Sequence, residues 1–177
     1  ALHNDVDAVA FTGSTAVGKL IMGYAAQSNL KRVGLECGGK SPQIVMADCA
    51  DLDAAADAAA WGVFYDQGQV CTAGTRLLVQ REIKDEFVEK VASIANDLVP
   101  GDPLDPDTRF GSLVDGTQMD TVLGYIARGA SEGATLVAGG KQAHNQSGGF
   151  YVEPTLFDGV KNDMAIAQEE IFGPVIS

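Results

Sequence analysis

Basic residues and histidines are scarce in this sequence of 177 residues. Its 12 Lys and Arg stand against 24 Asp and Glu, giving a formal net charge of −12. Because phosphate groups are bound by clustered cations, this balance argues against nucleic acids and anionic membrane surfaces as partners. The two histidines, His3 and His144, lie near the ends of the chain. We therefore expect no zinc site, and no histidine stands beside Cys71 as a candidate base.

Cysteine pairs, long apolar runs and targeting segments are also absent. Cys37, Cys49 and Cys71 form an odd count without a C-x-x-C motif, which favours reduced thiols in a cytoplasmic protein. No apolar run is as long as a membrane span, and no basic segment precedes an apolar one as in a signal peptide. The sequence starts at Ala1 and ends at Ser177 without a helix stop, so we expect a fragment of a longer polypeptide.

Strand and helix signals alternate along the chain. Strands are predicted at 7–13, 32–36, 43–46, 76–80, 135–140 and 151–157, and helices at 14–28, 48–65, 84–98 and 115–134. This alternation predicts an α/β protein with largely parallel strands, whose loops meet at one edge where ligands usually bind. We expect a surface connection at 99–111, a mobile loop at 141–149, and an edge or bulge at Pro154.

A glycine-containing turn, "FTGSTAVGKL", leads from the first predicted strand into the first helix. Gly13, Gly18 and Lys19 have the spacing of a nucleotide-hydrolysing P-loop, but Leu20 replaces the hydroxyl residue that would hold Mg²⁺. The turn still suits an anion, because glycine permits close backbone approach and a helix N-terminus presents free N–H groups. A plain strand-to-helix turn capped by Ser14 is the other interpretation.

Cys71 lies in "YDQGQVCTAGTR", 35 residues after Glu36. Glu36 ends a predicted strand, and a strand and a long helix then separate the two residues, so the chain can return Cys71 to the same edge. A thiol with a pKa of about 8.5 needs a base or a positive environment to become a good nucleophile, and Glu36 could act directly or through water. The residues alone leave alternatives open: a core thiol, and a structural ion pair of Glu36 with Lys40 or Arg32.

The blocks "FTGSTAVGK", "LECGGKSP", "FYDQGQVCTAGTR" and "EEIFGPV" together resemble the aldehyde dehydrogenase superfamily, in its order and near its spacings. The resemblance covers nearly the whole chain and implies a Rossmann-like parallel-sheet fold. Residues 1–37 would be the C-terminal part of the NAD(P)-binding domain, and residues 38–177 a truncated catalytic domain. We expect the isolated fragment to be inactive.

The same resemblance implies site residues. Cys71 matches the nucleophile, which forms a thiohemiacetal and then a thioester with the aldehyde, and Glu36 matches the general base. The expected cofactor is NAD or NADP, with NAD favoured. Its predicted contacts are Gly13, Ser14, Val17, Gly18, Gly38, Gln118, Glu170 and Phe172, and no metal is expected. Cys37 departs from the leucine of many members and could bring a second thiol close to the cofactor.

The wording of "GQVCTAGTR" and "ADCADLDAA" is most similar to the bacterial branch acting on amino-aldehydes, including γ-glutamyl-γ-aminobutyraldehyde dehydrogenases. The implied partner is a small aldehyde, and the implied assembly of the full-length protein is a homo-oligomer. A CoA-acylating relative is the first alternative, opposed by Glu36, which such relatives usually lack. The P-loop nucleotide-binding protein described above is the second.

Overall fold

The computed structural model describes residues 1–177, which divide into two compact units, Ala1–Gly39 and Lys40–Ser177. Each unit is described by itself. The assignment of residues 1–37 to a cofactor domain and of residues 38–177 to a catalytic domain remains a prediction. No helix in the chain combines the length and apolar character needed to cross a membrane.

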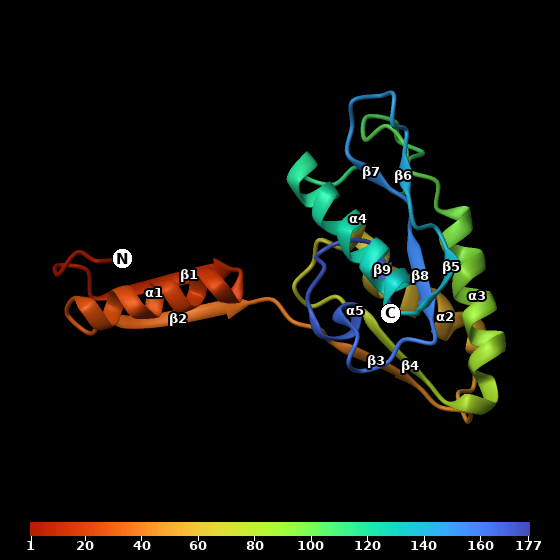
Figure 1. The fold of residues 1–177 in the computed structure, drawn as a ribbon, viewed down its shortest axis with the longest axis horizontal. Coiled ribbons are helices and arrows are strands. Elements are labelled where there is room, and N and C mark those ends of the chain that lie inside the picture. The colour runs from red at the N-terminus through yellow and green to blue at the C-terminus, as the bar shows by residue number, and fades with distance from the viewer. The chain divides into compact units, whose positions relative to one another are not determined.

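The first unit is one strand–helix–strand motif. Strand β1 (Ala8–Gly13) pairs in parallel with β2 (Arg32–Cys37), and α1 (Thr15–Gln27) connects them. Figure 1 shows α1 running along the β1–β2 pair. The helix begins after Ser14, whose Oγ accepts a hydrogen bond from the Val17 N–H at 3.3 Å. The predicted helix cap is therefore confirmed.

The second unit begins with the β3–β4 strand pair and adds helices and shorter strands. Its elements are β3 (Pro42–Val45), α2 (Leu52–Phe64), η1 (Tyr65–Gly68), β4 (Arg76–Val79), η2 (Arg81–Ile83), α3 (Lys84–Asp97), α4 (Gly116–Ser131), β5 (Thr135–Ala138), β6 (Gln142–Ala143), β7 (Tyr151–Val152), β8 (Thr155–Asp158), α5 (Ala165–Gln168) and β9 (Val175–Ile176). The pairs β3–β4 and β8–β9 are parallel, whereas β5–β8 and β6–β7 are antiparallel. The α/β class is confirmed.

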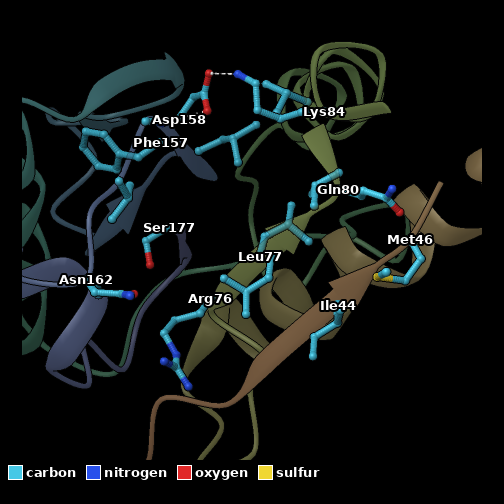
Figure 2. Close-up of a pocket in the computed structure, with 17 residues that line it drawn as sticks. Ile44, Met46, Arg76, Leu77, Gln80, Lys84, Phe157, Asp158, Asn162 and Ser177 are labelled. Atoms are coloured by element: carbon cyan, nitrogen blue, oxygen red, sulfur yellow. Dashed lines mark hydrogen bonds and ion pairs between the residues drawn. The ribbon is translucent and has the colours of Figure 1, made fainter. Parts of the chain in front are cut away.

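The residue after β9 ties the strand pairs of the second unit together. The Ser177 N–H donates to the Thr75 carbonyl at 2.8 Å, and the Leu77 N–H donates to the Ser177 carbonyl at 2.8 Å. This is the bonding pattern of neighbouring parallel strands. The chain end therefore lies between β4 and the β5–β8–β9 sheet, beside Leu77 in Figure 2.

Two clusters of buried apolar side chains form the core of the second unit. One joins α2 and α3 through Phe64, Phe87 and Val91. Small residues on α2, such as Ala60, let the two helices approach closely. The other cluster surrounds Val122 of α4 and includes residues near the C-terminal end of the chain. The helices α2, α3 and α4 thus each bury an apolar face in these clusters.

Three sequence-based expectations need correction. The segment 141–149 is not loop throughout, because β6 within it pairs with β7, and the His144 Nε2 lies 2.6 Å from the Pro100 carbonyl. Pro154 divides the predicted strand 151–157 into β7 and β8, since its missing N–H interrupts pairing. The connection 99–111 carries Phe110, which is only 1% exposed.

Candidate active site

Cys71 is exposed on a tight turn between α2 and β4. The turn is closed by the Ala73 N–H, which donates to the Val70 carbonyl at 3.1 Å. The backbone N–H of Cys71 donates to no acceptor within the chain. The thiol and an adjacent free N–H donor are thus presented together, the pair that a covalent reaction at a carbonyl carbon requires.

The segment before Cys71 has an unusual backbone. Asp66, Gln67 and Gly68 adopt consecutive positive φ angles of 48°, 54° and 73°. Such conformations cost free energy for non-glycine residues and persist only where the surroundings hold them. Gly68 is held because a Cβ there would overlap the carbonyl of Gly173. The turn carrying Cys71 is therefore in direct backbone contact with the "IFGPV" segment.

Gln43 anchors the segment that follows Cys71, and its role was not predicted. Its Nε2 donates to the Gly74 carbonyl at 2.9 Å and to the Ala59 carbonyl of α2 at 3.0 Å. Gly74 leaves room for this side chain, because a Cβ at that position would collide with the Gln43 Cγ. The only sequence signal was a polar residue inside an otherwise apolar strand. Gln43 ties the exit of the turn to α2 at the buried residue Ala59.

Gln118 holds the backbone at Ile171 and Phe172, next to the Gly173 that contacts the Cys71 turn. Its Nε2 donates to the Ile171 carbonyl at 3.0 Å and to the Phe172 carbonyl at 2.8 Å. Phe172 has a φ of 55° and a side chain that is 38% exposed. Both amide hydrogens of Gln118 are thus used within the protein. The structure shows a positioning role for Gln118 toward Phe172.

Glu170 and Lys40 bring unpartnered charges to the same region. The Glu170 Oε1 and the Lys40 Nζ are both buried, and neither has a hydrogen-bond partner. Burial and, to a smaller extent, the nearby charge of Arg76 lower the pKa of Lys40 to about 8, and Glu170 opposes the shift. The sequence offered Lys40 only as an ion-pair candidate for Glu36. Strongly perturbed groups of this kind mark candidate functional sites.

The site residues predicted in the first unit lie around the carboxyl ends of its two strands. In the β1–β2 register, Glu36 stands opposite Thr12, and Cys37 stands opposite Gly13. Glu36 is exposed, and no ion pair joins it to Arg32. Half-buried Gly38 follows the strand directly. These residues and the start of α1 therefore share one end of the motif.

The remaining predicted residues of α1 differ in exposure. Val17 is 41% exposed in the first turn, whereas Gly18 is buried. A Cβ at Gly18 would lie 3.1 Å from the Cys37 Sγ. Cys37 therefore packs beneath the helix, on the face of β2 opposite to Glu36. Cys49 packs against the α2–α3 core, and all three thiols are free.

A separate groove, drawn in Figure 2, lies between β4 and β8. Ile44, Leu78 and Phe157 contribute apolar surface to it, and an ion pair between Lys84 Nζ and Asp158 Oδ2 at 2.7 Å stands at its rim. None of the predicted site residues lines this groove. No group of three or more His, Cys, Asp or Glu side chains is arranged to hold a metal ion.

Comparison with protein-family models matches residues 1–177 to the aldehyde dehydrogenase family. The mitochondrial aldehyde dehydrogenase of Mesocricetus auratus is 52% identical over 176 residues, which are 99% of this chain and 35% of that protein. An indole-3-acetaldehyde dehydrogenase solved with NAD+ has a TM-score of 0.97 and 62% identity, over 99% of this chain and 36% of its own.

A third similar protein is the γ-glutamyl-γ-aminobutyraldehyde dehydrogenase from Burkholderia cenocepacia J2315. Its structure has a TM-score of 0.96 and 61% identity, over 99% of this chain and 35% of its own. The chain thus spans about a third of the length of these relatives.

Gly68→Ala in the full-length protein tests the backbone contact beside Cys71. We expect a loss of ~2–5 kcal/mol in unfolding free energy for two reasons. An alanine here would adopt a strained left-handed backbone conformation, and its Cβ would overlap the Gly173 carbonyl. Denaturant unfolding measures the loss. The control is Gly124→Ala in α4, where open space surrounds the new Cβ, so stability should rise by about 0.5–1 kcal/mol. Equal behaviour of the two variants would contradict the contact.

Gln118→Met tests the bonds to Ile171 and Phe172. The variant keeps the side-chain length but removes both donors, so we expect a loss of about 1–2 kcal/mol in unfolding free energy. Chemical denaturation of the full-length protein provides the measurement. The matched control, Gln27→Met, alters an exposed residue and should change stability by no more than about 0.5 kcal/mol. A Gln118 variant as stable as this control would refute the positioning role.

Proposed function

The chain belongs to the aldehyde dehydrogenase family, and we propose that the full-length protein oxidises an aldehyde to a carboxylic acid with NAD+ and Cys71 as the nucleophile. The observation that carries this proposal is the exposed thiol of Cys71 on a turn fixed from both sides. Gln43 holds the exit of that turn, and Gly68 packs its entrance against the Gly173 carbonyl.

In the proposed reaction, the Cys71 thiolate attacks the aldehyde carbon and forms a thiohemiacetal. The unpaired Cys71 N–H is available to stabilise the developing oxyanion. A bound nicotinamide cofactor would supply the hydride acceptor that the conversion of the thiohemiacetal into a thioester requires. Water then cleaves the thioester, releasing the carboxylic acid and the Cys71 thiol.

Glu36 is the proposed base for the water that cleaves the thioester. Its side chain is exposed at the end of β2, where water can reach the carboxylate. Glu36 also argues against the CoA-acylating alternative, whose members usually lack this residue. The P-loop alternative is not retained, because the family match includes the Gly13–Lys19 turn.

The predicted cofactor residues suit a dinucleotide. The N-terminus of α1 offers backbone N–H groups beside Ser14, the arrangement that binds pyrophosphate. The buried, unpartnered Glu170 Oε1 shows a carboxylate with unused bonding capacity, which suits a ribose hydroxyl. The exposed Phe172 ring offers a flat apolar surface for a nicotinamide. We propose contacts to NAD+ at Gly13, Ser14, Val17, Gly18, Gly38, Gln118, Glu170 and Phe172.

The proposed substrate class is the amino-aldehydes. The similarity to the γ-glutamyl-γ-aminobutyraldehyde dehydrogenase supports this class, and the similarity to the indole-3-acetaldehyde dehydrogenase makes aryl-acetaldehydes the second candidate. A homo-oligomeric full-length protein, a cytoplasmic location and inactivity of the isolated fragment remain predictions. On location, the curated relative described above is named as mitochondrial.

Cys71→Ser and Cys71→Ala in the full-length protein should abolish NAD+ reduction with aldehydes, because neither side chain provides a thiolate. Loss of a nucleophile typically lowers the rate by a factor of 10⁴ or more, of order 10⁶ in a well-studied hydrolase. The control is Cys49→Ala, since Cys49 packs against the core; it should keep near-normal turnover. Retained turnover in the Cys71 variants would remove this residue from the nucleophile role.

Glu36→Gln should slow deacylation, since the amide cannot take a proton from water at neutral pH. We expect a thioester on Cys71 to accumulate, detectable by acid quenching and mass spectrometry, and a steady-state rate lower by roughly 10²–10⁴-fold. Glu89→Gln, at an exposed position of α3, provides the control. An unchanged rate without thioester would sink the base assignment.

A further inference from the structure

Lys40 and Glu170 combine two features that seldom occur together. Each places a polar side-chain atom, Nζ or Oε1, out of contact with solvent, and each leaves that atom without a hydrogen bond. Buried polar atoms are nearly always partnered, because desolvation without a bond costs free energy. Orphaned atoms of opposite charge in one region therefore indicate bonding capacity held for another group.

The backbone around Lys40 is fixed. The Arg76 Nε donates to the Lys40 carbonyl at 2.8 Å and ties the segment before β3 to β4. Arg76 also repels the ammonium of Lys40, whereas Glu170 attracts it. Among the charges that act on Lys40, Glu170 is thus the one that favours the protonated ammonium.

The ion pair between Lys84 and Asp158 differs from the arrangement of Lys40 and Glu170. Lys84 Nζ and Asp158 Oδ2 lie 2.7 Å apart in a direct charge-assisted bond, with the Lys84 pKa raised and the Asp158 pKa lowered by their contact. Lys40 has the opposite behaviour, since its pKa is lowered to about 8, chiefly by burial. The Lys40 ammonium therefore interacts with the charge of Glu170 but makes no hydrogen bond to it.

We propose that Lys40 is a positioning residue whose ammonium charge keeps the Glu170 carboxylate turned toward the cofactor. This inference rests on the proposed function, in which Glu170 accepts a hydroxyl of the nicotinamide ribose. A nearby ammonium offsets the cost of desolvating the carboxylate when the dinucleotide covers the site. Lys40 itself needs no contact with substrate or cofactor.

The experiment measures NAD+ binding to the full-length protein by calorimetry, with Lys40→Met, Lys40→Arg and Glu170→Gln. Lys40→Met should weaken NAD+ binding roughly 10-fold or more, by analogy with the loss of a group that orients a metal ligand. Lys40→Arg should restore most of the affinity, because it keeps the charge. The exposed Lys161 provides the control as Lys161→Met, which should bind as the wild type.

Two further readouts separate positioning from a general structural defect. The alkylation rate of Cys71 by iodoacetamide should be the same in Lys40→Met and the wild type, since its turn is held by other residues. The effects of Lys40→Met and Glu170→Gln on affinity should be non-additive in the double variant, because both remove the same interaction.

The pH dependence supplies a signed test. Lys40 loses its proton as the pH rises through about 8, so NAD+ affinity should fall over that range. The measurement uses Cys71→Ala to remove the Cys71 thiol; Arg76 and Glu170 are the other charged groups that act on Lys40. The slope should vanish in Lys40→Met.

Each negative result would contradict a different part of the proposal. Absence of NAD+ binding by the wild type would overturn the proposed function and this inference with it. NAD+ binding that is unaffected by Lys40→Met, or additive effects in the double variant, would overturn the role of Lys40 alone. Wild-type affinity in Glu170→Gln would overturn the assignment of Glu170 on which that role depends.

Discussion

The close approach of Gly68 to the Gly173 carbonyl is the constraint on which the candidate site depends. It brings the turn before Cys71 against the segment that carries Glu170 and Phe172. On its other side, Gly173 packs so tightly against Val122 that a side chain there would collide with it. A backbone contact backed by a buried helix residue transmits little motion, because cores are close-packed. The position of the thiol is therefore set by the core.

Polar side chains add further constraints to the backbone contact between Gly68 and Gly173. Gln43 and Gln118 each donate two hydrogen bonds from one amide nitrogen to backbone carbonyls, and each thereby fixes a segment with no regular structure. Lys40 and Glu170 contribute charges that the protein leaves unpaired. Gln43 and Gln118 thus fix the backbone near the thiol, whereas Lys40 and Glu170 leave polar atoms free to bond to another group. Strain in the backbone of Phe172 and near Cys71 belongs to the same region, as expected of functional sites.

The sequence predicted the longer helices and strands because their signals are local. The Ser14 cap, the alanine-rich α2 and the apolar face of α3 each follow from spacing and composition. Cys71 and Glu36 were found by combining short motifs with a family resemblance that the comparisons confirm. Their roles and their meeting in one site remain proposals.

The residues that escaped prediction act at long range. Gln43 reaches across to α2 and to the Cys71 turn, and its partners are separated from it by 16 and 31 positions. Phe110 sits in a segment rich in Pro, Gly and Asp, yet packs into the core. The charge of Lys40 acts with Glu170, far along the chain, where the sequence suggested Glu36. No spacing rule contains such contacts, since they arise only when the elements pack.

The most direct test is NADH formation by the full-length protein with a panel of aldehydes, before and after labelling of Cys71 with iodoacetamide. Mass spectrometry establishes which of Cys37, Cys49 and Cys71 is labelled. The account predicts NADH formation with at least one amino-aldehyde or aryl-acetaldehyde, and its loss in proportion to labelling of Cys71. Absence of NADH with every aldehyde, or full turnover with Cys71 completely alkylated, would contradict it.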